Sequence, residues 1–410
     1  MVDVSAQRNL QVSGISRASD VAAKAATVRY GNAKTRTPAR AMFYSATNRL
    51  SESRALRPGL RSGINEIFRS LSREKVNEID GNLDEQRRFQ NTILATGSLE
   101  QLSEELLFTV FSLEGKSADG HFQSWLPSDH ETAYIVAFLT GMPSNNIVVP
   151  PTIPGASAAE YLAFLTQFFQ HLPSGRPVPV AGLVPNLPFR DVHPIMDFYI
   201  KHGLTDFVVD FHGKSPITNW SLLPALATQM RRIQKEHGTP FVHGLNVKYG
   251  MKSDRTGIVP ARDLFLMLEC FDSFGASHCR PKFNPAIFKK GLSPDGSEPI
   301  LSPRIFDARD YGYRRVTNSA ATLHGLLKEE GLPDVPRQRP SRESWEVPEL
   351  AKILNAARTA KECGVLIERI TEGKVRPHFD SKPGAKADIK KVDEVSHAYR
   401  GSRFGQESFI

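Results

Sequence analysis

The feature that most constrains the fold is an alternation of apolar runs and amphipathic helices between residues 130 and 280. The apolar runs are expected to be strands, at 146–150, 178–184, 206–211, 241–247 and 270–274. The helices expected between them lie at 161–172, 191–202, 220–237 and 262–269. Continuous apolar strands separated by helices of this length predict a parallel sheet that helices cover on both faces. The chain is therefore expected to be an α/β protein.

Two α/β architectures fit this pattern, an open doubly wound sheet and a closed barrel. No G-x-G-x-x-G follows a strand and no G-x-x-x-x-G-K-S/T occurs, so a dinucleotide or P-loop site has no support. We therefore expect a (β/α)8 TIM-like barrel over residues 28–335, with helical insertions that include a mostly helical stretch at 50–119. Residues 1–27 are expected to be flexible. Residues 336–410 are expected to form a basic C-terminal extension, with a helix at 347–371 and a flexible tail beyond 377.

Composition places the chain among soluble globular proteins, because 40% of its residues are hydrophobic and 23% are charged. No apolar run is long enough to cross a bilayer, and the N-terminus lacks the layout of a secretion signal. The three cysteines, Cys270, Cys279 and Cys363, have no CxxC spacing, which argues against a zinc knuckle or a disulfide framework. A reduced cytoplasmic protein without a membrane partner is expected.

The net charge is +8 and the sequence pI is about 9.3. An excess of cations suits a polyanionic partner, of which nucleic acid is the usual one. The alternative is a basic, solvated tail, because much of the excess lies near the C-terminus. The other features of the chain favour nucleic acid.

Polar side chains gather where the expected strands end. In a parallel barrel these ends meet at one rim, where such enzymes keep their reactive groups. Asp272 could attack a sugar carbon or bind a metal there, or it could merely cap the next turn. Asp210 ends an apolar strand, so its carboxylate must be paired, either by Lys214 or a backbone turn or by a substrate. The other candidates at this rim are His212, His243, Asn246, Ser273 and His278.

Three segments together resemble the tRNA-guanine transglycosylase family, including its DNA-acting 7-deazaguanine branch. The first is 30–39, where a glycine is followed by Thr-Pro, and the second is the glycine-containing strand 179–185. The third is the helix at 261–269 followed by Phe271-Asp272-Ser273, which is similar to the strand that carries the family's nucleophilic Asp. The strand 242–247 also lies where the family has a glycine-bearing strand. The resemblance implies a (β/α)8 barrel.

The resemblance also implies a base exchange in tRNA or DNA, in which guanine leaves and a 7-deazaguanine base replaces it. Asp272 would be the nucleophile, through a covalent intermediate, and Asp210 would contact the base or act as acid or base. The target nucleotide would have to leave its stack to reach the pocket. No cofactor and no metal are expected. The implied substrate-binding residues are Ala181, Gly182, His212, His243, Gly244, Asn246, Ser273 and His278.

The sequence departs from the family in three ways. An extra strand–helix unit at 206–237 separates the second and third of the segments that resemble the family. The chain also has no Asp-Ser-Gly-Gly-like segment, where the family keeps a base-recognising carboxylate, and it lacks the family's cysteine-rich zinc segment. Two other functions stay open. One is a metal-dependent barrel hydrolase, and the other is a barrel that binds nucleic acid without catalysis. The oligomeric state is also open, a homodimer included. The hydrolase would use Asp210, His212, His243 and Asp272.

Overall fold

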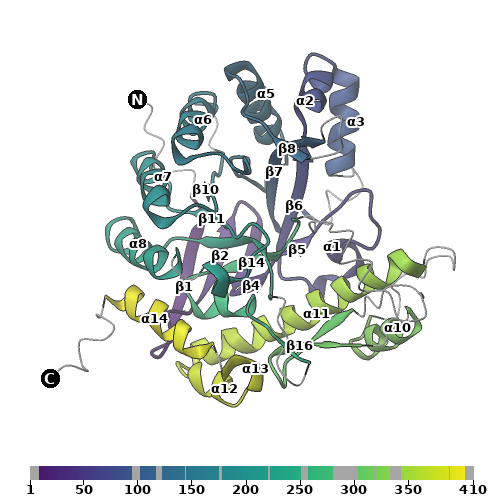
Figure 1. The fold of residues 1–410 in the computed structure, drawn as a ribbon, viewed down its shortest axis with the longest axis vertical. Coiled ribbons are helices and arrows are strands. Elements are labelled where there is room, and N and C mark those ends of the chain that lie inside the picture. The colour runs from purple at the N-terminus through teal and green to yellow at the C-terminus, as the bar shows by residue number, and fades with distance from the viewer. Residues whose placement is uncertain are drawn as a thin grey trace.

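The computed structural model describes residues 9–94, 102–116, 122–143, 145–174, 178–219, 222–250, 257–279, 303–316, 320–332, 343–386 and 388–401. It is a mixed α/β structure in which parallel strands lie inside a layer of helices (Figure 1). Within these ranges, no helix combines the length and the apolar character that a membrane span requires.

The strands are β1 (Gln11–Arg17), β2 (Lys24–Tyr30), β3 (Ala33–Thr37), β4 (Ala39–Arg40), β5 (Met42–Phe43), β6 (Ile64–Leu71), β7 (Leu106–Lys116), β8 (Phe122–Ser124), β9 (Asn146–Val148), β10 (Gly182–Val184), β11 (Phe207–Asp210), β12 (Val242–Val247), β13 (Val259–Pro260), β14 (Ser273–Ala276), β15 (Arg304–Asp307) and β16 (Gly312–Arg315). The helices are α1 (Glu52–Ala55), η1 (Pro58–Leu60), α2 (Arg73–Ile79), α3 (Leu83–Ile93), α5 (Asp129–Thr140), α6 (Ala158–Gln170), α7 (Phe189–Lys201), η3 (Pro216–Asn219), α8 (Leu222–His237), η4 (Leu264–Leu268), α10 (Ala320–Glu329), α11 (Glu343–Thr371), α12 (Arg376–Asp380), α13 (Pro383–Lys386) and α14 (Ile389–Arg400).

Two parallel ladders form the centre of the molecule. In one, β5, β6, β7 and β9 pair in that order, and in the other β10, β11, β12, β14 and β4 do so. An isolated parallel bridge between Val148 and Val180 joins β9 to the segment that leads into β10. Strands β10, β11 and β12 are buried along their whole length, as expected for a parallel sheet that helices cover.

Helices α5, α6, α7 and α8 follow β7, β9, β10 and β11 in turn and cover the outside of the strands (Figure 1). Capping explains where two of them begin. Ser128 and Glu131 form a capping box at α5, and Ser157 and Glu160 form one at α6, so each pair satisfies amide groups that the first helical turn leaves open. The alternation predicted for 130–280 is therefore confirmed.

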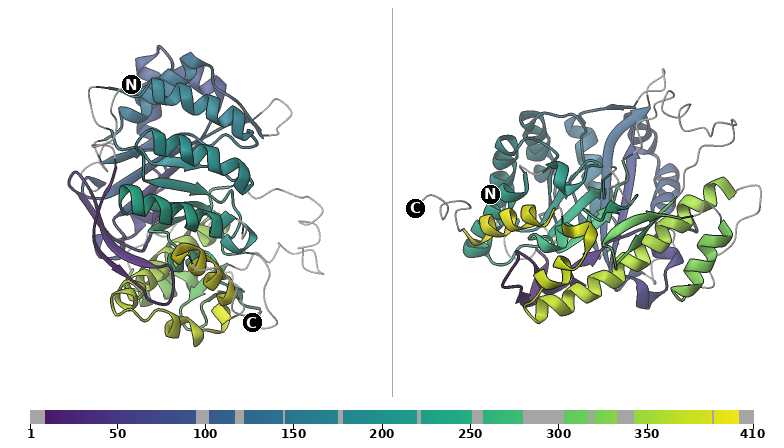
Figure 2. Two further views of the ribbon diagram at one scale, coloured as in Figure 1. Left: turned by 90° about the vertical axis from the view of Figure 1, so that its left-hand side faces the viewer. Right: turned by 60° about the horizontal axis from the view of Figure 1, so that its bottom comes forward.

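An antiparallel sheet of β1, β2 and β3 covers the amino ends of the parallel strands, and the left panel of Figure 2 shows these purple strands along one side of the molecule. Leu10 N–H donates to Asp206 (2.6 Å), just before β11, and Lys24 pairs with Asp272 (2.9 Å), just before β14. Residues 11–17 are thus an ordered strand, and the prediction of a flexible segment is wrong there. Residues 1–8 lie outside the described part.

The other end of the chain forms a second packed layer. Helices α10 and α11 enclose a separate apolar cluster around Leu323, Leu350 and Leu354, and β13, β16 and β15 form a small antiparallel sheet beside them. The helix predicted at 347–371 is confirmed within α11. The flexible tail predicted beyond 377 is wrong up to residue 401, because α12, α13 and α14 follow there and α14 packs on α8.

Two further predictions differ from the structure. The stretch 50–119 is only partly helical, because β6 and β7 lie in it beside α1, η1, α2 and α3, and these two strands pair in parallel. The helix expected at 262–269 is the short 3-10 helix η4, and the strand expected at 270–274 begins only at Ser273. This offset places Asp272 before the strand, at its amino end.

Candidate active site

A pocket of about 690 Å³ lies at the carboxyl ends of β5, β6, β12 and β14, where they face α11 and β16. In α/β barrels and sheets this is the end at which ligands bind. The lining combines aromatic rings, cations and carboxylates with a few small and neutral side chains. The lining residues are Arg40, Phe43, Glu52, Phe68, Arg69, Ser70, Val247, Lys248, Tyr249, Asp263, Phe274, Ala276, Ser277, His278, Cys279, Tyr313, Lys352, Asn355 and Thr359.

A buried carboxylate, Glu66, lies beneath this pocket and holds two histidines. Strand β6 points it inward, and its Oε2 meets His243 Nε2 at 2.7 Å while its Oε1 meets His278 Nε2. Burial alone would raise the pKa of Glu66. The charges and hydrogen bonds of His278 and His243 outweigh burial and hold that pKa at about 2. Glu66 therefore stays ionised at any ordinary pH.

His278 connects this carboxylate to the pocket. Its ring stacks on Phe68 with centroids 5.0 Å apart and planes 10° apart, and Phe43 packs against its other side. Its backbone N–H donates to Asn246 Oδ1 (3.0 Å). Among the described residues, Nδ1 of His278 has no hydrogen-bond partner. An imidazole fixed through one nitrogen by a carboxylate, with its second nitrogen open, is arranged for proton transfer.

Gly275 makes room for Glu66. A Cβ added at residue 275 would lie 2.6 Å from Glu66 Cδ and nearer still to its Oε2. Because Glu66 is bonded on both sides to histidines, its side chain cannot move away without breaking one of these bonds. The small residue in the middle of β14 is thus required by the carboxylate on β6.

Replacing Gly275 with alanine is therefore expected to displace Glu66 and to destabilise the protein by about 1 to 3 kcal/mol. Chemical denaturation would measure the loss. Gly325→Ala is the matched control, because a Cβ at residue 325, in α10, meets nothing within 4 Å. Equal stabilities of the two variants would contradict this account of Gly275.

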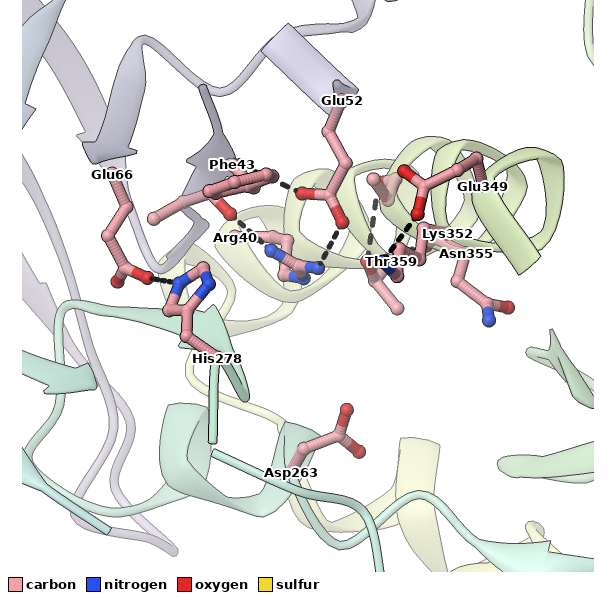
Figure 3. A network of polar contacts seen from close by, with 12 residues as sticks. Arg40, Phe43, Glu52, Glu66, Asp263, His278, Glu349, Lys352, Asn355 and Thr359 are labelled. Atoms are coloured by element: carbon pink, nitrogen blue, oxygen red, sulfur yellow. Dashed lines mark hydrogen bonds and ion pairs between the residues drawn. The ribbon is translucent and has the colours of Figure 1, made fainter. Parts of the chain in front are cut away.

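Asp263 offers the pocket a second carboxyl group. Its Oδ2 accepts a 2.6 Å hydrogen bond from the Tyr313 hydroxyl, whereas its buried Oδ1 has no partner among the described residues. Burial raises the pKa of Asp263 to about 6, against the opposing effects of the Tyr313 hydrogen bond and the Arg40 charge. The Asp263 and Leu264 amides also lower it, but neither meets Oδ1 with hydrogen-bond geometry. Figure 3 shows this carboxyl group pointing towards the side on which Arg40 and α11 lie.

An ion pair and an aromatic wall complete the pocket. Arg40 is buried and pairs with Glu52 at 3.0 Å, and its guanidinium lies 5.8 Å from the Phe274 ring centroid (Figure 3). Tyr249 stacks on Tyr313 with centroids 4.0 Å apart. Such rings offer stacking surfaces to a planar ligand, and the charges offer hydrogen bonds to its edge.

Asp272, the expected nucleophile, does not line this pocket and lies at the opposite end of the strands. It precedes β14 and its exposed fraction is 0%. Its carboxylate pairs with Lys24 (2.9 Å) and accepts hydrogen bonds from Val242 N–H (2.9 Å) and the Thr37 hydroxyl (3.3 Å). Burial raises the pKa of Asp272, opposed by Lys24. The expected presentation at a strand's carboxyl end is therefore corrected, since this group joins the N-terminal sheet to the central strands.

Other predicted residues do come together. Asp210 Oδ1 accepts hydrogen bonds from Asn246 Nδ2 (2.9 Å) and His212 N–H (2.8 Å), and Asn246 in turn holds His278. His212 and Asn246 have φ of 48° and 57°, a strained conformation for these residues. Burial raises the pKa of Asp210. Asp210 is thus partnered by a backbone turn and an amide, and it supports the loop that carries His278.

The remaining predicted residues are internal. Both ring nitrogens of His243 are engaged, by Glu66 and by the Ser273 hydroxyl (2.9 Å). Ala181 and Gly182 are buried outside the pocket lining, and a Cβ at 182 would lie 2.7 Å from the Tyr199 ring. Gly244 is hemmed in by Leu266. Across the described ranges, no group of three or more His, Cys, Asp or Glu side chains could hold a metal, so the proposed hydrolase set is not assembled.

The sequence reasoning missed Glu66, Asp263 and Arg40. The sequence holds only a weak signal for Glu66, because the segment Ile64–Leu71 mixes apolar and polar residues and only its strand structure buries the glutamate, which must then be paired. The prediction of a mostly helical stretch at 50–119 does not bury Glu66 in a strand, so it requires no partner for this carboxylate. Asp263 carried no local signal, because its place beside the pocket depends on Tyr313, fifty residues away.

Comparison with known proteins adds no assignment. No family model matches this chain, and a search of curated proteins finds no significant match.

Proposed function

We propose that the strands of the two parallel ladders close into a (β/α)8 barrel, in which β4 and β5 count together as one of the eight strands. The support is a circuit of neighbours. The segment 39–43 pairs through β4 with β14 and through β5 with β6, and the ladders continue through β7 to β9 and from β10 through β12. Between β9 and β10, Val148 N–H donates to Pro179 O (2.9 Å) and Ala181 N–H to Val148 O (3.0 Å). The pocket is then the mouth of this barrel.

We further propose that the chain is a base-exchange enzyme of the transglycosylase class, which replaces guanine by a 7-deazaguanine in tRNA or DNA. The observation that carries the proposal is that two side chains line one pocket. They are Asp263, one carboxyl oxygen of which has no partner in the described part of the chain, and His278, the imidazole of which is held by Glu66. Glycosyl transfer through a covalent intermediate needs both a carboxylate nucleophile and a separate acid or base. The stacking surfaces of Tyr249 and Phe43 suit a planar base.

In this scheme the Asp263 side chain, which lines the pocket with its Oδ1 buried, first turns that oxygen towards the ligand. Oδ1 then attacks the anomeric carbon, and the bond between that carbon and the departing ring nitrogen breaks. The electron pair goes to the nitrogen, which takes a proton from protonated His278. The incoming base then gives its ring N–H proton to neutral His278, and its nitrogen attacks the anomeric carbon and expels the carboxylate. The two steps return His278 to its starting state and retain the sugar configuration.

Asp263→Asn tests this assignment. Incubation with tRNA or duplex DNA and a labelled 7-deazaguanine should give incorporation by the wild type, and the variant should lose it by about 10³-fold or more. No covalent adduct should appear on a denaturing gel. Asp84→Asn, an exposed residue on α3, is the control and should keep full activity.

Stability separates lost chemistry from lost folding. The folded-state pKa of Asp263, about 6, lies above its unfolded value of 3.8, so ionisation lowers stability from pH 3.8 upwards and fully above pH 6. Asparagine removes that penalty and still accepts from Tyr313. Asp263→Asn should therefore be at least as stable as the wild type at pH 8. Incorporation by the variant at the wild-type rate, or none by the wild type with either nucleic acid, would refute the proposal.

A further inference from the structure

The N-terminal sheet presents a regular array of hydrogen-bond donors on its outer face. Register places Gln11, Arg29 and Lys34 in one row across β1, β2 and β3, and Ser13, Thr27 and Arg36 in the next row. The residues between these rows, such as Val28 and Thr35, point inward and are buried. We call these six side chains the outer array.

The outer array is strongly cationic. Arg29 and Lys34 lie directly opposite each other, a like-charge pair that destabilises an antiparallel sheet. Arg29, Lys34 and Arg36 are exposed, and no acidic partner is found for them among the described residues. The only carboxylate between residues 10 and 43 is Asp20, which accepts from the Arg376 N–H instead. Repulsion of this kind is relieved when an external polyanion binds.

We propose that the outer array is a docking surface for the phosphate backbone of duplex nucleic acid. Arg and Lys together with Ser, Thr and Gln are the side chains that contact phosphate oxygens without reading sequence. The array contains no aromatic ring, and binding to single strands depends on stacking bases on such rings, so a duplex is favoured. A membrane surface fits less well, because Ile15, only 37% exposed, is the one large apolar side chain on this sheet among the exposed hydrophobics of the described chain.

The surface is separate from the pocket. Lys24 and Leu10 attach the sheet to Asp272 and Asp206, at the amino ends of β14 and β11, whereas the pocket lies at the carboxyl ends. Binding here does not rest on the base-exchange proposal, and it is measured without any turnover.

The test compares two triple variants of equal charge. Arg29→Gln, Lys34→Gln and Arg36→Gln remove the cations of the array, and Arg87→Gln, Lys201→Gln and Lys235→Gln remove three exposed cations elsewhere. Each triple lowers the net charge by three, from +8 to +5. The probes are a fluorescent 20-base-pair DNA duplex, the RNA duplex of the same sequence and one DNA strand alone, all in fluorescence anisotropy across a salt series.

The array variant should bind at least one duplex about tenfold more weakly than the wild type at 50 mM salt. The slope of the logarithm of the binding constant against the logarithm of the salt concentration should become less steep by about 2.7. The control variant should stay within about threefold of the wild type. Three results with the nucleic-acid probes would overturn the proposal. They are no duplex binding by the wild type, equal weakening by both triples, or binding of the single strand as tightly as the duplexes. Binding to phosphatidylserine vesicles but to neither duplex would also overturn it. Because the substituted side chains are exposed, circular dichroism melting should show both triples folded.

Discussion

Replacing Lys24 with methionine is expected to lower the free energy of unfolding by about 3 to 5 kcal/mol. Lys24 Nζ lies 2.9 Å from Asp272 Oδ2, and the two side chains are 3% and 0% exposed. It also donates to the Pro240 carbonyl. Removing one partner of such a pair leaves the other charge buried without compensation, which costs far more than the intact pair contributes. Urea denaturation at pH 7 measures the loss.

The loss should grow with pH. Without Lys24, only the hydrogen bonds from Val242 N–H and the Thr37 hydroxyl oppose the effect of burial on the pKa of Asp272, so the folded-state pKa lies further above the unfolded value. A carboxyl group whose folded-state pKa is raised makes the folded protein less stable as pH rises from the unfolded pKa to the folded pKa. The gap between Lys24→Met and the wild type should therefore be wider at pH 8 than at pH 5.

A double variant supplies the control. Lys24→Met combined with Asp272→Asn removes both charges, and the amide oxygen can still accept from Val242 N–H, so it should recover more than half of the loss. A single variant within 1 kcal/mol of the wild type, or a double variant as unstable as the single one, would show that the pair does not hold the sheet in place.

This result also distinguishes a structural from a catalytic Asp272. A nucleophile exposed at a barrel mouth loses activity on conversion to asparagine while the fold stays intact. The structure instead predicts that Asp272→Asn changes stability, because Lys24 then has no carboxylate to pair with in the interior.

Asp272 was predicted at the wrong end of its strand because the observed strand begins three residues later than the predicted one. Apolar continuity predicts that a strand exists near 270–274, and a strand does lie there, at Ser273–Ala276. Continuity does not fix where a strand begins, because Cys270 and Phe271 are as buried outside the strand as Phe274 is within it. A shift of a few residues therefore moves Asp272 from the carboxyl end of the strand, where a catalytic role is expected, to its amino end, where a structural role is expected.

The site residues that the sequence predicts are those that a local pattern marks, namely polar side chains at or near the ends of apolar strands. Asp210 ends β11, Asn246 lies near the end of β12 and His278 comes shortly after β14, and the structure brings the three together. Glu66 and Asp263 depend on contacts of 177 to 212 residues and of 50 residues along the chain, to the histidines and to Tyr313 respectively. No local pattern in one sequence encodes such pairings.

Glu66→Gln is expected to have the second large effect, on rate and on stability together. Glutamine keeps the shape but removes the charge that fixes His278, so turnover in base incorporation should fall by about 10²-fold or more. Glu66 acts through His278 and does not line the pocket, so it is a positioning residue, and KM should change little while kcat falls. A variant in which KM rises and kcat is unchanged would contradict this role.

The stability of the same variant has a defined pH dependence. The folded-state pKa of Glu66, about 2, lies below its ordinary value of 4.5, so its contribution is fully present above pH 4.5 and disappears as pH falls towards 2. At pH 7 the difference from the wild type should be about 3 kcal/mol, and at pH 3.5 about 2 kcal/mol. Denaturation at both pH values measures it. A difference that stays constant between them would mean that the histidines do not hold Glu66 as an ionised carboxylate, and the acid–base assignment of His278 would lose its basis.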